Sequence, residues 1–235
     1  MQSNIIKSLN VELCCYSLSE ALLAQRGEAD RIEFCTAKEL DGISPSRESI
    51  IEVLNQITIP VYIIVRPRGG NFIYTQEEIN WMCDEMKWAV HHGVSGFVFG
   101  TLNDENKIDI INCKKLIDAS DGFPCTFHRA FDTIENKLEA MDILYSLGFK
   151  RILTSGGVGN AEKYINVLKE LVAYANDRII IIPGGGIRLH NVLQIVNETK
   201  CSEIHSSDGG IINIRKNKKI ICTVLFYALI FVASS

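Results

Sequence analysis

The stretch Pro60-Val-Tyr-Ile-Ile-Val-Arg-Pro-Arg-Gly-Gly70 runs from an apolar strand pattern directly into two arginines, a proline and two glycines. Residues 61–65 are apolar on both faces, which is typical of a parallel strand that is covered on both sides. Arg66 shares a face with Ile64 by the two-residue period, so its guanidinium should point inward, where it needs an anionic partner. The stretch therefore predicts an anion site or an internal ion pair at the end of a buried strand.

The composition fits one globular domain. With 235 residues, of which 47% are hydrophobic, the chain can bury one sizeable core. A net charge of −4 and a pI of about 5.8, without a basic stripe, argue against nucleic acid or an anionic membrane as a partner. The first ten residues hold no apolar stretch long enough for a signal peptide, so we expect the eight cysteines to be thiols in a reducing compartment.

Short apolar runs alternate with helical patterns along the chain, which is typical of repeated βα units. We expect strands at residues 10–15, 31–35, 61–65, 96–100, 124–129, 151–155, 178–183 and 203–206. Helical patterns cover residues 18–26, 46–54, 75–92, 109–119, 161–175 and 188–197, and Thr75 with Glu78 predicts a capping box. Eight parallel strands with right-handed crossovers close most naturally into a TIM-type (β/α)₈ barrel, here over residues 10–210 after an N-terminal extension of residues 1–9.

Such barrels place their sites at the C-terminal ends of the strands, and these ends are polar in this sequence. Applying the two-residue period to each strand, we expect the following inward side chains at the mouth: Cys14, Cys35, Arg66, Phe99, His128, Thr154, Pro183 and His205. One layer deeper we expect Glu12, Glu33, Ile64, Phe97, Thr126, Ile152, Ile181 and Glu203. The sequence thus predicts a charged mouth rather than a uniformly apolar core.

Two cysteines at this mouth suggest a metal site. Cys14 and Cys35 end parallel Glu-x-Cys pairs on neighbouring strands, which lie about 4.8 Å apart in a sheet. Soft thiolates select Cu(I) or zinc over hard cations, and His128 or His205 would be a further ligand. The alternative is that both cysteines are small buried hydrophobic residues.

Two other chemistries compete for the same mouth. Arginines and a glycine-rich turn that leads into a helix predict anion or phosphate binding by Arg66, Arg68, Arg129, Gly184, Gly185 and Gly186. Crowded carboxylates and a histidine predict acid/base catalysis, with Glu12, Glu33, His128 and Glu203 as candidates. No lysine falls at an inward strand end, which counts against a Schiff-base aldolase.

Several segments resemble the CutC family of copper homeostasis proteins, in matching order over about residues 10–207. They are Val11-Glu-Leu-Cys14, Ala29-Asp-Arg-Ile-Glu-Phe-Cys35, Val65-Arg-Pro-Arg-Gly-Gly70, Phe97-Val-Phe-Gly100, Thr126-Phe-His-Arg-Ala-Phe-Asp132, Arg151-Ile-Leu-Thr-Ser-Gly156, Pro183-Gly-Gly-Gly-Ile187 and Glu203-Ile-His205. The resemblance implies a TIM-type barrel, a cytosolic and sometimes also nuclear location, and self-association. It also implies copper handling, with Cu(I) bound at the positions of Cys14 and Cys35.

The chain departs from the family pattern after Ser207. In place of the expected final helix it carries a basic patch at residues 215–219 and an apolar run at residues 220–233, which is shorter than the about 20 residues of a membrane-spanning helix. Residues 211–235 are therefore interpreted as a divergent apolar tail. The expected function is Cu(I) binding in copper homeostasis, and the alternative is an enzyme acting on a small phosphorylated or carboxylated ligand.

Overall fold

The computed structural model describes residues 9–207, so the predicted tail, and the predicted extension apart from Leu9, lie outside the described residues. This part of the chain contains eight strands: β1 Asn10–Cys15, β2 Arg31–Phe34, β3 Val61–Ile64, β4 Gly96–Phe99, β5 Cys125–Phe127, β6 Arg151–Thr154, β7 Ile180–Pro183 and β8 Glu203–Ser207. The helices of this region are α1 Leu18–Arg26, α2 Arg47–Leu54, α3 Gln76–Val90, α4 Ile110–Ala119, α5 Lys137–Leu147, α6 Ile165–Ala175 and α7 Val192–Thr199.

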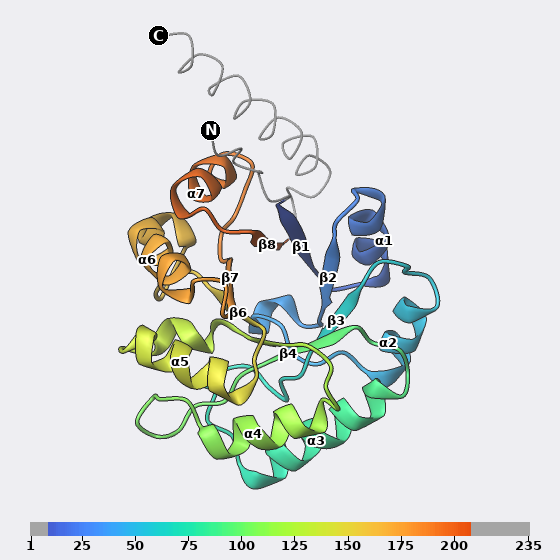
Figure 1. The fold of residues 1–235 in the computed structure, drawn as a ribbon. Coiled ribbons are helices and arrows are strands. Elements are labelled where there is room, and N and C mark those ends of the chain that lie inside the picture. The colour runs from blue at the N-terminus through green and yellow to red at the C-terminus, as the bar shows by residue number, and fades with distance from the viewer. Residues whose placement is uncertain (1–8, 208–235) are drawn as a thin grey trace, which may run out of the picture.

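The strands form one parallel sheet in the order β7-β6-β5-β4-β3-β2-β1-β8, which curls into a nearly closed barrel surrounded by helices (Figure 1). β7 and β8, the two ends of this order, face each other across the seam, where a Cβ built on Gly184 would lie 3.3 Å from the Cβ of His205. The predicted TIM-type barrel is therefore confirmed. All C-terminal strand ends consequently meet at one mouth.

The helices follow local signals that the sequence displays. Thr75 accepts a hydrogen bond from the backbone N–H of Glu78, and the Glu78 side chain accepts one from Thr75, so the predicted capping box opens α3. Met82 and Met86 of the same helix are fully buried against the sheet. Within residues 9–207, none of the helices has the length and hydrophobicity needed to cross a bilayer.

The core has an outer and an inner layer. The large outer layer lies between the sheet and the helices and contains Phe97, Phe99, Ile152 and Ile181. A smaller cluster fills part of the barrel interior and is made by Cys14, Cys35, Tyr62, Ile64 and Val98. The inner cluster thus brings both predicted metal-binding cysteines to the same place.

The predicted facing of three strands is wrong. Phe97 and Phe99 of β4 face the helices, where Phe99 packs on Phe149 with ring centroids 5.1 Å apart, whereas Val98 faces inward. In β6 and β7, Ile152 and Ile181 lie in the outer layer. Instead of Ile152 and Thr154, Arg151 and Leu153 face the interior. At the end of β7, Gly184 faces the interior instead of Ile181 and Pro183, since a Cβ on Gly184 would contact Leu153 and His205. β4 and β7 are apolar on both faces, and β6 carries one polar residue on each face, Arg151 and Thr154, so the two-residue period does not say which face is inside.

Candidate functional site

A cavity of about 270 Å³ opens at the C-terminal mouth of the barrel. Its wall brings together seven of the predicted site residues: Cys14, Glu33, Cys35, Arg66, His128, Arg129 and Gly185. His205, named as a possible metal ligand, lines it as well. Glu12 and Glu203 lie deeper in the barrel and are not part of this wall.

A buried ion network forms the layer beneath the cavity. Arg31 of β2 donates from Nε to Glu12 and from Nη2 to Glu203, the latter over 2.7 Å. Arg151 of β6 donates to Glu203 over 3.1 Å and to the Tyr62 hydroxyl over 3.2 Å. Glu12 and Glu203 are therefore engaged in ion pairs, which argues against the catalytic role predicted for them.

The network orients His205. Its Nδ1 donates to Glu12 over 2.7 Å. Burial opposes the ionisation of Glu12, but Arg31 and the hydrogen bond from His205 lower the pKa of this carboxyl to about 2. Burial likewise opposes a charge on His205, yet its bonds to Cys14 and Glu12 raise the pKa of the imidazole well above its usual value. The imidazole is thus held in one orientation, with Nε2 on the side of Glu33.

The two predicted metal-binding cysteines meet. The Sγ atoms of Cys14 and Cys35 lie 3.2 Å apart, with both side chains buried. The hydrogen bond from Cys35, aided by His205 against the effect of burial, lowers the pKa of the Cys14 thiol to about 5. The same hydrogen bond, together with burial, raises the pKa of the Cys35 thiol. The pair therefore holds one thiolate, on Cys14, and one thiol.

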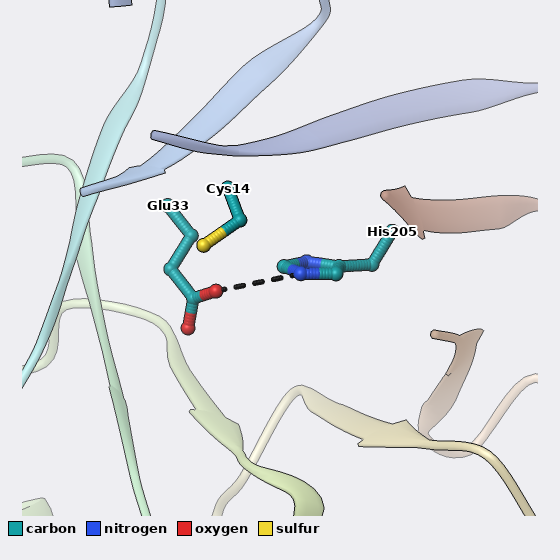
Figure 2. A group of neighbouring side chains, drawn as sticks. All are labelled: Cys14, Glu33 and His205. Atoms are coloured by element: carbon teal, nitrogen blue, oxygen red, sulfur yellow. Dashed lines mark ion pairs between the residues drawn. The ribbon is translucent and has the colours of Figure 1, made fainter. Parts of the chain in front are cut away.

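A second donor set overlaps this pair. Ligand atoms of Cys14, Glu33 and His205 all lie within 4.8 Å of one another, and their side chains converge from β1, β2 and β8 (Figure 2). Glu33 Oε2 lies 3.6 Å from His205 Nε2. Burial, and then the negative charge of Cys14, raise the pKa of Glu33 well above its usual value. Cys14 belongs to both possible donor sets.

Two of the predicted anion-binding arginines are held by protein groups. Arg66 is buried as predicted, but it donates to the backbone carbonyls of Leu40, Asp41, Gly42 and Gly70 rather than to a carboxylate. Arg68 lies outside the cavity wall and pairs with Glu78 over 2.6 Å. The structure therefore does not bring Arg68 together with the other predicted anion-binding residues.

Arg129 keeps a free edge at the cavity. Its Nε donates to Asp132 over 2.8 Å, and its Nη2 donates to Ser155 and to the carbonyl of Gly159. The guanidinium lies on Gly185, where a Cβ would come within 3.0 Å of Cζ. Within residues 9–207, no hydrogen bond engages Nη1.

The glycine turn differs from the prediction. Gly184 donates to the carbonyl of Thr154, and the carbonyls of Gly185 and Gly186 accept hydrogen bonds from the protein. α7 begins only at Val192, so the turn does not lead directly into the amides of a helix N-terminus. Of the three glycines, Gly185 lines the cavity.

His128 is a neutral histidine in the cavity wall. Its Nδ1 accepts a hydrogen bond from the backbone N–H of Ala130, so the proton lies on Nε2, for which the described residues provide no acceptor. Burial, and then the positive charge of Arg66, lower the pKa of His128 to about 3. His128 is thus a hydrogen-bond donor at neutral pH.

This shift predicts a pH dependence of stability. In the unfolded chain His128 binds a proton below about pH 6.5, whereas in the folded protein it does so only below about pH 3. Since the unfolded state binds more protons between these values, the free energy of unfolding falls as the pH falls through this window. At pH 5 the expected contribution is roughly 2 kcal/mol. Urea unfolding measures the free energy of unfolding at pH 7 and at pH 5. The decrease between these two pH values should be smaller by this amount in His128→Gln than in the wild type. The exposed His190 provides the control His190→Gln, and equal losses in all three proteins would contradict the assignment.

Sequence reasoning missed Arg31, Arg151 and Tyr62 of the interior and Asp132, which orients Arg129. Arg31 and Tyr62 carried a usable signal, because the two-residue period that places Glu33 and Ile64 inward continues back to them. Arg151 carried none, since the facing of its strand was ambiguous. Asp132 lies in the short 3₁₀ segment Arg129–Thr133, where no strand period applies.

The chain is similar to known proteins of one family. The model of the CutC family matches residues 9–210. The chain belongs to the CutC family. A family protein CutC from Klebsiella pneumoniae is 43% identical over 199 residues, which cover 85% of this chain and 80% of that protein. A human protein named copper homeostasis protein cutC homolog is 38% identical over 197 residues, covering 84% of this chain and 72% of that protein.

A solved CutC structure has the same barrel. The crystal structure of the putative copper homeostasis protein CutC from Streptococcus agalactiae superposes with a TM-score of 0.81 at 34% identity, covering 84% of this chain and 98% of that one. The family resemblance predicted from the short segments is confirmed by these matches.

Proposed function

We propose that this CutC family member binds Cu(I) as part of copper homeostasis, with Cys14, Cys35 and His205 as ligands. The observation that carries the proposal is the pair of sulfur atoms 3.2 Å apart in the wall of the cavity, with the imidazole of His205 close to Cys14. The name of the human relative supports the choice of metal.

The donor set suits a soft monovalent metal. Thiolate sulfur and imidazole nitrogen are ligands that Cu(I) accepts, whereas Glu33 offers a hard oxygen that suits other cations better. The two sulfur atoms are in direct contact with each other, so they would have to move apart to hold one ion between them.

His205 would act as a ligand through Nε2. The metal then replaces the proton on this nitrogen, while Nδ1 continues to donate to Glu12. A ligating histidine that donates its second N–H to a carboxylate has a fixed ring orientation and a more basic nitrogen. The ion network beneath the cavity thus supports the metal site from below.

Anaerobic titration of the full chain with Cu(I), in competition with a chromogenic chelator, tests this function. We expect one tightly bound ion per chain and an X-ray absorption spectrum with two sulfur neighbours and one nitrogen neighbour. Retention of all copper by the chelator, or a spectrum with nitrogen and oxygen neighbours alone, would contradict the proposal.

Cu(I) chemistry with free thiols requires a reducing compartment, so we propose a cytoplasmic location together with this function. The seven cysteines within residues 9–207 are all free, in keeping with this location. Nuclear presence and self-association, which the family resemblance implies, stay predictions.

A further inference from the structure

We propose that the cavity also binds a small organic anion, a carboxylate or a phosphate ester, between Arg66 and Arg129. This inference goes beyond copper binding and does not depend on it. Both arginines line the same cavity as Cys14 and His205. Arg66 follows β3, and Arg129 follows β5 with its guanidinium on Gly185 after β7. The cavity that holds the sulfur pair therefore also holds two guanidinium groups.

Arg66 is a buried cation without a counter-charge. It is 4% exposed, and its Nη1 and Nη2 donate to neutral backbone carbonyls. None of the ion pairs within residues 9–207 includes Arg66, and no hydrogen bond engages its Nε there, the neutral Tyr74 hydroxyl being the nearby polar group. A buried charge is costly unless it is paired, so an anion in the cavity would stabilise this guanidinium.

His128 adds a second donor beside it. Its Nε2–H has no acceptor among the described residues, and the ring contacts Phe72, which also carries the Arg66 guanidinium 4.9 Å above its ring. Two donors without acceptors thus lie around one aromatic ring beside the cavity. Both atoms are closed to solvent in this structure, so a ligand oxygen would reach them only with a local shift of the Phe72 ring or its loop.

Arg129, the next residue along the chain, adds a second guanidinium to the same cavity. Asp132 and two further acceptors fix its Nε and Nη2, which leaves the Nη1 edge for a ligand. Asp132 itself accepts hydrogen bonds from Thr154 and Ser155, so it orients Arg129 rather than repelling a ligand as a free carboxylate. A guanidinium fixed in this way is preorganised for an anion.

The other acidic groups of the cavity do not neutralise these guanidinium groups. Asp41 is exposed at the rim and meets Arg66 through its backbone carbonyl, and Glu33 lies against His205. The volume of about 270 Å³ is at the lower limit of small-molecule pockets, which fits a ligand of few carbon atoms.

Isothermal titration calorimetry on the metal-free full chain tests the proposal, with inorganic phosphate and malonate as separate probes. We expect at least one probe to bind the wild type, and Arg66→Met and Arg129→Met each to weaken it about tenfold or more, the loss of a charge-assisted hydrogen bond. Arg68→Met is the matched control, because Arg68 belongs to the same stretch but lies outside the cavity. It should leave binding unchanged. The stronger probe decides between carboxylate and phosphate.

Loss of anion binding can be distinguished from loss of copper binding and from misfolding. Cys14→Ser/Cys35→Ser should keep anion binding, so failure of the copper function would not remove this result. Arg66 also donates hydrogen bonds to four loop carbonyls, so Arg66→Met would disturb these loops as well as the anion site. Arg129→Met is therefore the second, independent variant. Absence of heat with both probes, or equal affinity in the wild type and in Arg129→Met, would overturn the proposal.

Discussion

Replacing Arg31 by methionine should lower the free energy of unfolding by roughly 3–5 kcal/mol at pH 7. The side chain is 9% exposed and is shared by Glu12 and Glu203, so its removal leaves two buried carboxylates without their common cation. Glu203 keeps Arg151 and Glu12 keeps His205, but neither arrangement restores the lost hydrogen bonds. Urea unfolding of the wild type and of Arg31→Met, followed by circular dichroism, measures the difference.

Arg178→Met is the control for this experiment. Arg178 pairs with Asp142 over 2.9 Å, but the two side chains are 38% and 44% exposed. Surface ion pairs contribute about 0–1 kcal/mol, so Arg178→Met should change stability little. Equal losses in the two variants would show that the ion network is not the buried support that its geometry indicates.

The fold was predictable because it repeats one pattern. Eight apolar runs, with helical patterns in six of the seven intervals between them, leave little choice besides a barrel, and each strand was found close to its predicted position. The helix of the remaining interval, α5, was not predicted. Local chemistry was also predictable where a single motif determines it, as in the Thr75 and Glu78 capping box. The facing of β4, β6 and β7 was not, because β4 and β7 are apolar on both faces and β6 has one polar residue on each face, Arg151 and Thr154.

Glycine at an inward position explains part of this failure. Gly96 of β4 leaves room for the ring of Tyr62, which a Cβ would approach within 2.6 Å. The inward face of β4 is thus defined by a missing side chain, and a search for large apolar residues selects Phe97 and Phe99 instead. Strand register, which the single sequence does not provide, is needed to recognise such a position.

The candidate site was predicted in part for a similar reason. Cys14, Cys35 and His205 lie on strands with clear polar residues at alternate positions, and they meet as expected. The arginines were recognised as inward or near the mouth, but their partners could not be predicted. Arg66 is held by loop carbonyls and Arg68 by Glu78, contacts that depend on how the loops after β2 and β3 fold.

Replacing both Cys14 and Cys35 by serine should weaken Cu(I) binding more than about a thousandfold, which corresponds to roughly 4 kcal/mol. A serine hydroxyl stays protonated at neutral pH and offers a hard oxygen, so neither new side chain substitutes for a thiolate. Each single variant leaves one sulfur and His205 and should therefore lie between the wild type and the double variant. Competition titration under anaerobic conditions gives the affinities.

Cys15→Ser provides the matched control, since Cys15 follows Cys14 directly but packs in the outer layer against the helices. It should bind Cu(I) as the wild type does. The single variant Cys35→Ser separates the two donor sets of the cavity, because Cys14, Glu33 and His205 remain intact in it. Wild-type affinity in Cys35→Ser would assign the metal to that oxygen-containing set, and wild-type affinity in the double variant would remove copper from this wall altogether.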